Sequence, residues 1–166
     1  LNNSIDNLTG NEYVSTQIEE LNLRDSLDEV LNSIRSLTSH SKAVITIDFS
    51  EVENIKFNKA YMKSVFLNLL TNSIKYAKRD HAPVIKIQST RINGINQLTF
   101  SDEGQGFDMD KVRDKIFGLY EKFHSNSDSN GIGLYLVYNH ITSLGGRIAV
   151  ESKINEGATF TISFKY

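Results

Sequence analysis

The sequence predicts an α+β domain with two layers, in which helices cover one face of a mixed, mostly antiparallel sheet. Segments with helical and with strand-like apolar spacing follow one another in the order α-β-α-β-β-loop-α-β-β. Two strand-like segments, 84–90 and 95–101, are joined at Asn93-Gly94, a dipeptide typical of tight hairpin turns. Strands joined in this way are antiparallel neighbours, and the helices on either side of them in the sequence can then pack on one face of the sheet.

Helices are expected where apolar residues recur at spacings of three and four. The first amphipathic segment begins near Asn22, and its apolar face is formed by Leu27, Val30, Leu31, Ile34 and Leu37. The second helix is predicted over 58–78. The third is predicted over 134–144, and Gly145-Gly146 ends it.

The remaining strands are indicated by alternation of apolar and polar residues. Residues 43–49 form the first predicted strand, and residues 147–152 and 159–166 form the last two. Residues 1–22 are polar and weakly patterned, and we expect the tail of an upstream helix followed by a linker. The sequence therefore predicts one folded domain over residues 23–166.

The composition excludes several classes of function. The 166 residues include 18 Lys and Arg and 20 Asp and Glu, and the net charge of −2 gives no general attraction to nucleic acid or acidic membranes. The absence of Cys excludes disulfides and thiolate chemistry. No apolar run is long enough to span a bilayer, and the first residues do not resemble a signal peptide. Because the chain does not begin with Met, we expect it to be part of a longer protein, and the absence of Cys fits a reducing compartment such as the cytoplasm.

The second predicted helix carries a polar stripe opposite its apolar face. Asn68, Asn72 and Lys75 lie within about 60° of one another at 100° per residue. Amide oxygens are suitable ligands for Mg²⁺, and a Lys ammonium group can contact a phosphate. A solvated polar face is the simpler explanation of this stripe when it is considered alone.

Glycine-rich segments follow one predicted strand and precede the third predicted helix. Asp102 ends a strand and is followed by Gly104 and Gly106, and its carboxylate could accept a hydrogen bond from the amino group of a purine. Gly131 and Gly133 precede a helix whose first backbone N–H groups could bind phosphate. Neither the Rossmann nor the Walker A pattern is present. Each segment alone is also compatible with an ordinary turn.

The order of these motifs resembles the catalytic, ATP-binding domain of sensor histidine kinases. This family shares its Bergerat-type fold with DNA gyrase, the Hsp90 chaperone and MutL. The four matching segments are 68–77, 102–107, 131–134 and 157–159, and the resemblance extends over residues 22–166. It implies that the domain binds ATP together with Mg²⁺.

The resemblance also implies roles for individual residues at the phosphate end of the site. Asn72 matches the asparagine that binds Mg²⁺, and Asn68, one turn earlier, assists it. Lys75 and Tyr76 match positions that contact the phosphates and flank the nucleotide. These residues would therefore hold the reacting end of ATP.

At the adenine end, Asp102 matches the aspartate that recognises the amino group of the base. Gly104 and Gly106 match the glycines of the pocket wall, next to Phe107. Thr159 matches the threonine that supports the adenine subsite through the aspartate and a water molecule.

A lid over the nucleotide is implied at about residues 108–130. Gly131 and Gly133 match its hinge glycines and are followed by Leu134. The segment 117–124 resembles the F-box of the family, and Lys122 is a candidate phosphate contact within it. Three positions depart from the usual pattern of the kinases: Glu103 stands where Asn is common, Asn130 where Gly is frequent, and His124 where Tyr is frequent.

One position distinguishes phosphotransfer from ATP hydrolysis. In ATP-hydrolysing relatives, a glutamate four residues before the Mg²⁺ asparagine activates water, whereas this chain has Asn68, which is a poor base. The resemblance therefore implies transfer of the γ-phosphoryl group to a histidine on an upstream dimerisation domain, with a response regulator as a further partner. None of the four histidines, His40, His81, His124 and His140, lies in the family's acceptor context. We expect no partner among nucleic acids and no membrane contact.

Two other functions stay open at this point. The fold could serve as a degenerate, nucleotide-gated interaction module, or as an ATPase of the gyrase and Hsp90 type. Asn68 argues against the ATPase, and the intact Asn72, Asp102, Gly106 and Gly133 argue against the degenerate module.

Overall fold

The structure is a computed structural model that describes residues 17–118 and 130–166. Within these residues, five strands form one mixed sheet in the order β2-β4-β5-β7-β6, and β1 pairs with β3 in a separate two-stranded sheet. The strands are β1 (Glu19–Asn22), β2 (Val44–Asp48), β3 (Asn54–Phe57), β4 (Val84–Ile92), β5 (Ile95–Asp102), β6 (Arg147–Lys153) and β7 (Gly157–Ser163). The helices are α2 (Leu23–Ser33), α3 (Arg35–Ser41), α4 (Lys59–Lys75), α5 (Met109–Val112) and α7 (Asn130–Ser143).

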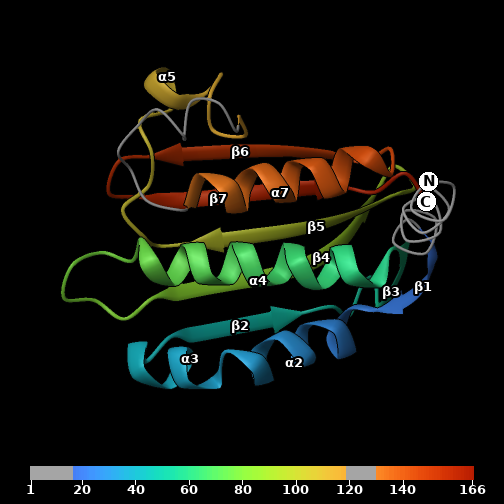
Figure 1. Ribbon diagram of the computed structural model, residues 1–166, viewed down its shortest axis with the longest axis horizontal. Coiled ribbons are helices and arrows are strands. Elements are labelled where there is room, and N and C mark those ends of the chain that lie inside the picture. The colour runs from blue at the N-terminus through green and yellow to red at the C-terminus, as the bar shows by residue number, and fades with distance from the viewer. Residues whose placement is uncertain (1–16, 119–129) are drawn as a thin grey trace, which may run out of the picture.

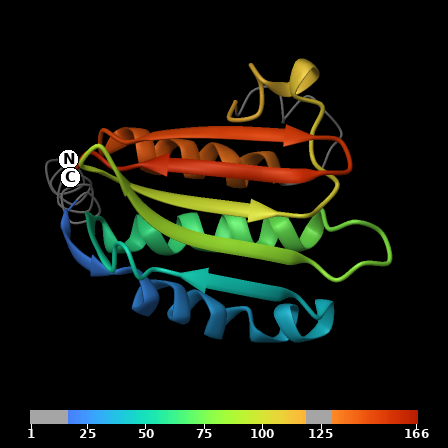
Figure 2. The same cartoon turned by 180° about the vertical axis from the view of Figure 1, so that it is seen from behind.

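The helices α2, α3, α4 and α7 lie on one face of the five-stranded sheet (Figure 1), and the view from behind shows the strands in front of them (Figure 2). β2 is parallel to β4, and the other neighbouring pairs of this sheet are antiparallel. The predicted α+β fold with two layers is therefore confirmed. No helix in the described ranges combines the length and the apolar character needed to cross a membrane.

The central hairpin forms as the sequence predicts. β4 and β5 pair from Ile85 with Asp102 to Ile92 with Ile95, and the chain turns at Asn93-Gly94. Both turn residues have positive φ, 52° for Asn93 and 78° for Gly94, as the two-residue hairpin turn with this sequence requires. This pairing places Asp102 at the end of β5, on the edge of the sheet where the candidate site lies.

The core lies between the sheet and the helices. Leu98 and Phe100 of β5 alternate with more exposed residues, so they share the face that packs on the helices. α4 buries the face that contains Met62, Val65, Phe66, Leu69 and Leu70. Burying an apolar side chain of this size contributes about 1.5–3 kcal/mol. These contacts fix α4 against the sheet, and α4 in turn carries the polar stripe of the predicted site.

The N-terminal part of the described chain differs from the prediction. Glu19–Asn22 forms β1, which pairs with the unpredicted strand β3, whereas we expected a linker there. The side chain of Asn58, which is buried, caps α4 by accepting from Tyr61 N at 3.0 Å and donates to Gln17 O at 2.9 Å. The chain that enters the domain is therefore fixed to the start of α4. Residues 1–16 lie outside the described residues.

Helix boundaries also differ from the predicted ones. The first helix is interrupted at Ile34, which has φ −110° and ψ 21° and separates α2 from α3. α4 ends at Lys75, three residues before the predicted end. α7 begins at Asn130, so Gly131 and Gly133 lie within its first turn and do not precede it.

Candidate nucleotide-binding site

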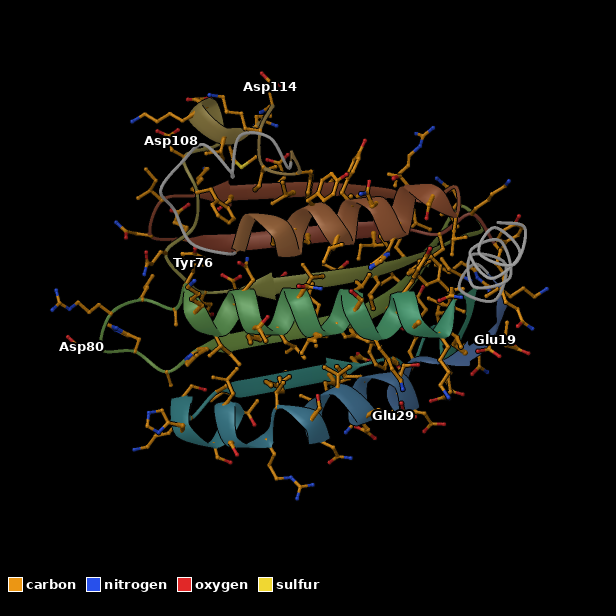
Figure 3. The ribbon with its side chains drawn as sticks, viewed as in Figure 1. Glu19, Glu29, Tyr76, Asp80, Asp108 and Asp114 are labelled. Carbon is orange, nitrogen blue, oxygen red and sulfur yellow. The ribbon has the colours of Figure 1, made fainter. Side chains whose placement is uncertain are left out.

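Four elements meet at the edge of the domain where β5 ends. The end of α4, the segment after β5, the beginning of β7 and the beginning of α7 lie together there, and Figure 3 shows Tyr76 at the end of α4 on this side of the molecule. The backbone carbonyl of Tyr76 accepts a hydrogen bond from Gln105 N at 2.9 Å. This contact connects the end of α4 to the glycine-rich segment.

Asp102 is held by hydrogen bonds from three of these elements. Its Oδ1 accepts from Gly104 N at 2.9 Å and from Ala158 N at 3.3 Å, and its Oδ2 accepts from Ser73 Oγ at 3.1 Å. Ser73 is buried on the inner face of α4. Because each carboxylate oxygen has more than one acceptor position, Oδ2 can accept a further hydrogen bond from a ligand. Asp102 is thus an oriented acceptor of the kind that recognises an amino group.

Two glycines permit this close packing around Asp102. Gly106 has φ +69°, and a Cβ there would lie 2.0 Å from Lys153 O. Gly157 has φ +85°, and a Cβ there would lie 1.9 Å from Asp102 O. Both positions therefore exclude other residues through backbone conformation and through space. They allow the backbone segments around Asp102 to approach each other closely.

The polar stripe of α4 approaches the beginning of α7. Asn68 Nδ2 donates to Ser64 O at 2.7 Å and to Ser64 Oγ at 3.1 Å. Asn68 Oδ1 faces α7, because a Cβ added at Gly133 would lie 2.8 Å from this oxygen. Asn72 is half-buried one turn further along α4, about 40° around the helix from Asn68.

The last residues of α4 add positive charge and an aromatic ring. Lys75 is exposed, and its Nζ lies 5.8 Å from the centroid of the Tyr76 ring. The structure therefore brings Asn68, Asn72 and Lys75 onto one stripe, as the sequence predicts. Asp102 is connected to the same helix by the hydrogen bond that Ser73 donates to it.

Residues of this site are suitable for Mg²⁺. The Asn68 amide nitrogen donates to Ser64 O and to Ser64 Oγ, and its oxygen is the group that faces α7. Amide oxygens are hard ligands, and Mg²⁺ commonly combines few protein ligands with substrate phosphates. Within residues 17–118 and 130–166, no cluster of three or more His, Cys, Asp or Glu could hold a metal ion.

A histidine not assigned to the site adjoins the polar stripe. His140 of α7 stacks on Tyr61 of α4, with ring centroids 4.2 Å apart and an interplanar angle of 25°. Its Nε2 lies 3.1 Å from Ser64 Oγ. Burial lowers the pKa of His140 from its ordinary value, so the ring is neutral near pH 7.

The predicted role of Thr159 does not agree with the structure. Ala158 pairs with Asp102 and donates its N–H to it, whereas Thr159 pairs with Ser101, and their hydroxyl oxygens are 3.1 Å apart. Adjacent strand residues point to opposite faces of a sheet, so Thr159 points away from the Asp102 side chain. Ala158 occupies the position expected for Thr159.

Two further residues of the predicted site, Leu134 and Phe107, lie against the core. Leu134 is only 2% exposed and packs in the core beneath the site. Phe107 is half-buried against the core, and its N–H donates to Ser152 Oγ at 2.8 Å. Phe107 also lines a cavity of about 390 Å³ with residues of α5 and of the end of β6, among them Arg113. Asp102 is not among the residues that line this cavity.

The predicted lid is described only in part. α5 lies within it, and Phe117 stacks on Tyr138 of α7 with ring centroids 5.5 Å apart. Residues 119–129, which include Lys122 and His124, lie outside the described residues. Of the other histidines, His40 lies in α3 and His81 lies in the loop before β4.

Sequence reasoning missed Ser64, Ser73, Ala158 and His140. Ser73 gives the clearest signal that could have been used, because it falls on the apolar face of α4 together with Leu69 and Leu70. A polar residue on a buried helical face needs a partner, and here that partner is Asp102. Ser64 and His140 are 76 positions apart, so their contact has no signal in one sequence.

Comparison with known proteins assigns the family. Residues 58–166 match the family described as "Histidine kinase-, DNA gyrase B-, and HSP90-like ATPase". The chain belongs to this family. Among curated proteins, it is 30% identical over 161 residues to cyanobacterial phytochrome A of a Nostoc species, covering 94% of this chain and 20% of that protein. It is 25% identical over 154 residues to the signal transduction histidine-protein kinase ArlS of Staphylococcus aureus, covering 91% and 34% respectively.

Solved structures agree with this assignment at the level of the fold. The catalytic domain of the histidine kinase ThkA superposes with a TM-score of 0.74 at 21% identity, covering 89% of this chain and 95% of that one. The chain spans roughly a fifth to a third of the length of the curated relatives that it matches. It therefore corresponds to one domain of those longer proteins.

Proposed function

We propose that this chain is the catalytic domain of a sensor histidine kinase. In this proposal it binds ATP with Mg²⁺ and transfers the γ-phosphoryl group to a histidine on an upstream dimerisation domain. The observation that carries the proposal is that one helix, α4, connects an oriented acceptor, Asp102, to the polar stripe of Asn68, Asn72 and Lys75. Family membership and the named kinases among the relatives support it.

The adenine end of the proposed site is at Asp102. Its Oδ2 would accept a hydrogen bond from the 6-amino group of the base, while two backbone N–H groups keep Oδ1 in place. A base with an oxygen at this position would place two acceptors opposite each other. This arrangement favours adenine over 6-oxo purines.

The phosphate end is at Asn68, Asn72 and Lys75. The oxygens of both asparagines would hold Mg²⁺ together with phosphate oxygens of the nucleotide, and Lys75 would meet a phosphate at the end of α4. Bound in this way, Mg²⁺ would neutralise charge on the phosphates. The protein's own contribution is to position the γ-phosphate for attack, because phosphoryl transfer depends mainly on positioning and electrostatic stabilisation.

The structure around Asn68 favours transfer to a side chain over hydrolysis. A general base for water needs an unoccupied basic group, but the Asn68 amide has no basic group and its hydrogens are directed to Ser64. In the proposed reaction, a histidine nitrogen attacks the γ-phosphorus. The bond between the γ-phosphorus and the oxygen that bridges it to the β-phosphate breaks, and ADP leaves. His140 is an unsuitable acceptor, because its Nε2 is within hydrogen-bond distance of Ser64 and its ring stacks on Tyr61.

The partners in this proposal are the upstream acceptor domain, through which the full protein forms a homodimer, and a response regulator. Since both ATP and response regulators are cytoplasmic, the domain would lie in the cytoplasm. The phosphotransfer assay joins this chain to the preceding segment of its parent protein and supplies ATP labelled on the γ-phosphate. We expect label on the protein that is stable in base and labile in acid, and its loss in Asn72→Ala. Release of labelled phosphate without labelled protein would refute the kinase proposal in favour of an ATPase.

A further inference from the structure

Ser64 joins the two helices that carry the phosphate end of the site. Its Oγ lies 3.1 Å from Asn68 Nδ2 on α4 and 3.1 Å from His140 Nε2 on α7. Ser64 and Asn68 are one helical turn apart, and Gly133 and His140 are about two turns apart on α7. The antiparallel helices therefore meet twice, at Asn68 with Gly133 and at Ser64 with His140 (Figure 1).

Ser64 determines which atom of Asn68 faces the site. An asparagine amide can turn over and exchange its oxygen and nitrogen, and only the oxygen can bind a cation. Because Nδ2 donates to both Ser64 O and Ser64 Oγ, the turned amide would lose both of these bonds and place its oxygen against the carbonyl oxygen of Ser64. The observed orientation, with Oδ1 toward Gly133, is therefore the favoured one.

His140 in turn determines the position of the Ser64 hydroxyl. A serine within a helix commonly bonds to a backbone carbonyl of its own preceding turn. Here the Ser64 hydroxyl has a partner on the neighbouring helix, and the ring of that partner is fixed by stacking on Tyr61. A neutral imidazole has one N–H and one acceptor nitrogen, so its Nε2 can pair with the hydroxyl in either tautomer.

We propose that Ser64 and His140 are positioning residues that hold the Asn68 oxygen toward the cation site and thereby couple the placement of α7 to metal binding. The inference rests on the proposed function, because it assigns Asn68 to Mg²⁺. It adds a partner on α7, which begins directly after the predicted lid segment, to a metal site otherwise built on α4.

Calorimetric titration of the chain with a non-hydrolysable ATP analogue, with and without Mg²⁺, tests the inference. The measured quantity is the dissociation constant without Mg²⁺ divided by the dissociation constant with Mg²⁺. This ratio isolates the contribution of the cation from that of the adenine pocket. We expect Ser64→Ala and His140→Leu to lower this ratio by roughly threefold to tenfold, the loss of about one net hydrogen bond. Affinity without Mg²⁺ should not change, because Asp102 is held by other residues.

Two control variants separate positioning from general packing. Ser143→Ala makes the same chemical change on α7, where the hydroxyl bonds only to His140 O of its own helix, and it should leave the ratio unchanged. His140→Gln places an amide at a similar reach toward Ser64 and should restore the ratio lost in His140→Leu. An unchanged ratio in Ser64→Ala and His140→Leu would overturn the inference, as would an equal loss in His140→Gln or Ser143→Ala.

NMR of the Asn68 side-chain amide supplies a second readout that needs no nucleotide. In the wild type we expect its two hydrogens to exchange slowly with water, and in Ser64→Ala and His140→Leu to exchange at least about threefold faster. Equal exchange in all of these proteins would overturn the inference alone. A wild type that binds no ATP analogue would refute the proposed function and the assignment of Asn68 with it.

Discussion

Replacing Asp102 with Asn tests base recognition without disturbing the fold. The amide oxygen of Asn can accept from Gly104 N and Ala158 N as Oδ1 does, at 2.9 and 3.3 Å. The amide nitrogen then takes the place of Oδ2, and the Ser73 hydroxyl, which donates to Oδ2 across 3.1 Å, can rotate to accept from it. The free energy of unfolding should therefore change by less than about 1 kcal/mol.

The effect on ATP binding should be much larger than the effect on stability. The 6-amino group of adenine would meet an amide N–H in place of a charged acceptor. Loss of a hydrogen bond to a charged group costs about 1.5–3 kcal/mol, which weakens binding by roughly 10- to 150-fold. Inosine triphosphate carries an oxygen at this position and should bind Asp102→Asn better than it binds the wild type.

Calorimetry with ATP and with inosine triphosphate measures the effect on both proteins. Asp110→Asn is a matched control, because it removes the same charge from an exposed residue of α5. We expect this control to keep the preference for ATP. If Asp102→Asn bound ATP as tightly as the wild type while its thermal unfolding was unchanged, the assignment of Asp102 to the base would be wrong.

Three further predictions concern stability and ionisation. Gly157→Ala should lower the free energy of unfolding by about 3 kcal/mol or more, because its Cβ would lie 1.9 Å from Asp102 O. Gly94→Ala is the control: its Cβ would have no atom within 4 Å, and it should cost about 1 kcal/mol. Equal losses of the two variants in urea unfolding would contradict this prediction. Burial lowers the pKa of His140 below 6.5, so the unfolded chain binds more protons than the folded one below that pH. The wild type should therefore lose stability relative to His140→Gln as the pH falls from 6.5. Parallel profiles of unfolding free energy against pH for the two proteins would contradict this prediction. The hydroxyl and the N–H of Ser50 both donate to Asp48 Oδ1, and these bonds lower the pKa of Asp48. NMR titration of Ser50→Ala should show the pKa of Asp48 rising toward 3.8. An unchanged pKa would exclude the hydroxyl as the cause.

The parts of the fold that follow local rules could be predicted from the sequence. The apolar spacing of α4 and the Asn93-Gly94 turn are local, and both appear as expected. β1 and β3 were missed because each has four residues, too few to show a clear alternation, and they pair with each other apart from the main sheet. The break at Ile34 was missed because the apolar spacing continues across it.

Some residues of the candidate site could likewise be placed from local rules, and others could not. Asn68, Asn72 and Lys75 could be placed on one stripe because a helix has a known period, and Asp102 could be placed at a strand end. Thr159 was placed wrongly because a shift of one residue along a strand moves a side chain to the other face. The contact of Ser64 with His140 depends on how α4 packs on α7, which the two helical patterns alone do not specify.

The most direct test of the account is a titration of the isotopically labelled chain with an ATP analogue and Mg²⁺, followed by two-dimensional NMR of the backbone amides. We expect the largest shifts at Ser73, Gly104 and Ala158 and in the turn of α4 that contains Asn68 and Asn72. Shifts confined to the cavity lined by Met109, Arg113 and Lys153, or no shifts at all, would contradict it.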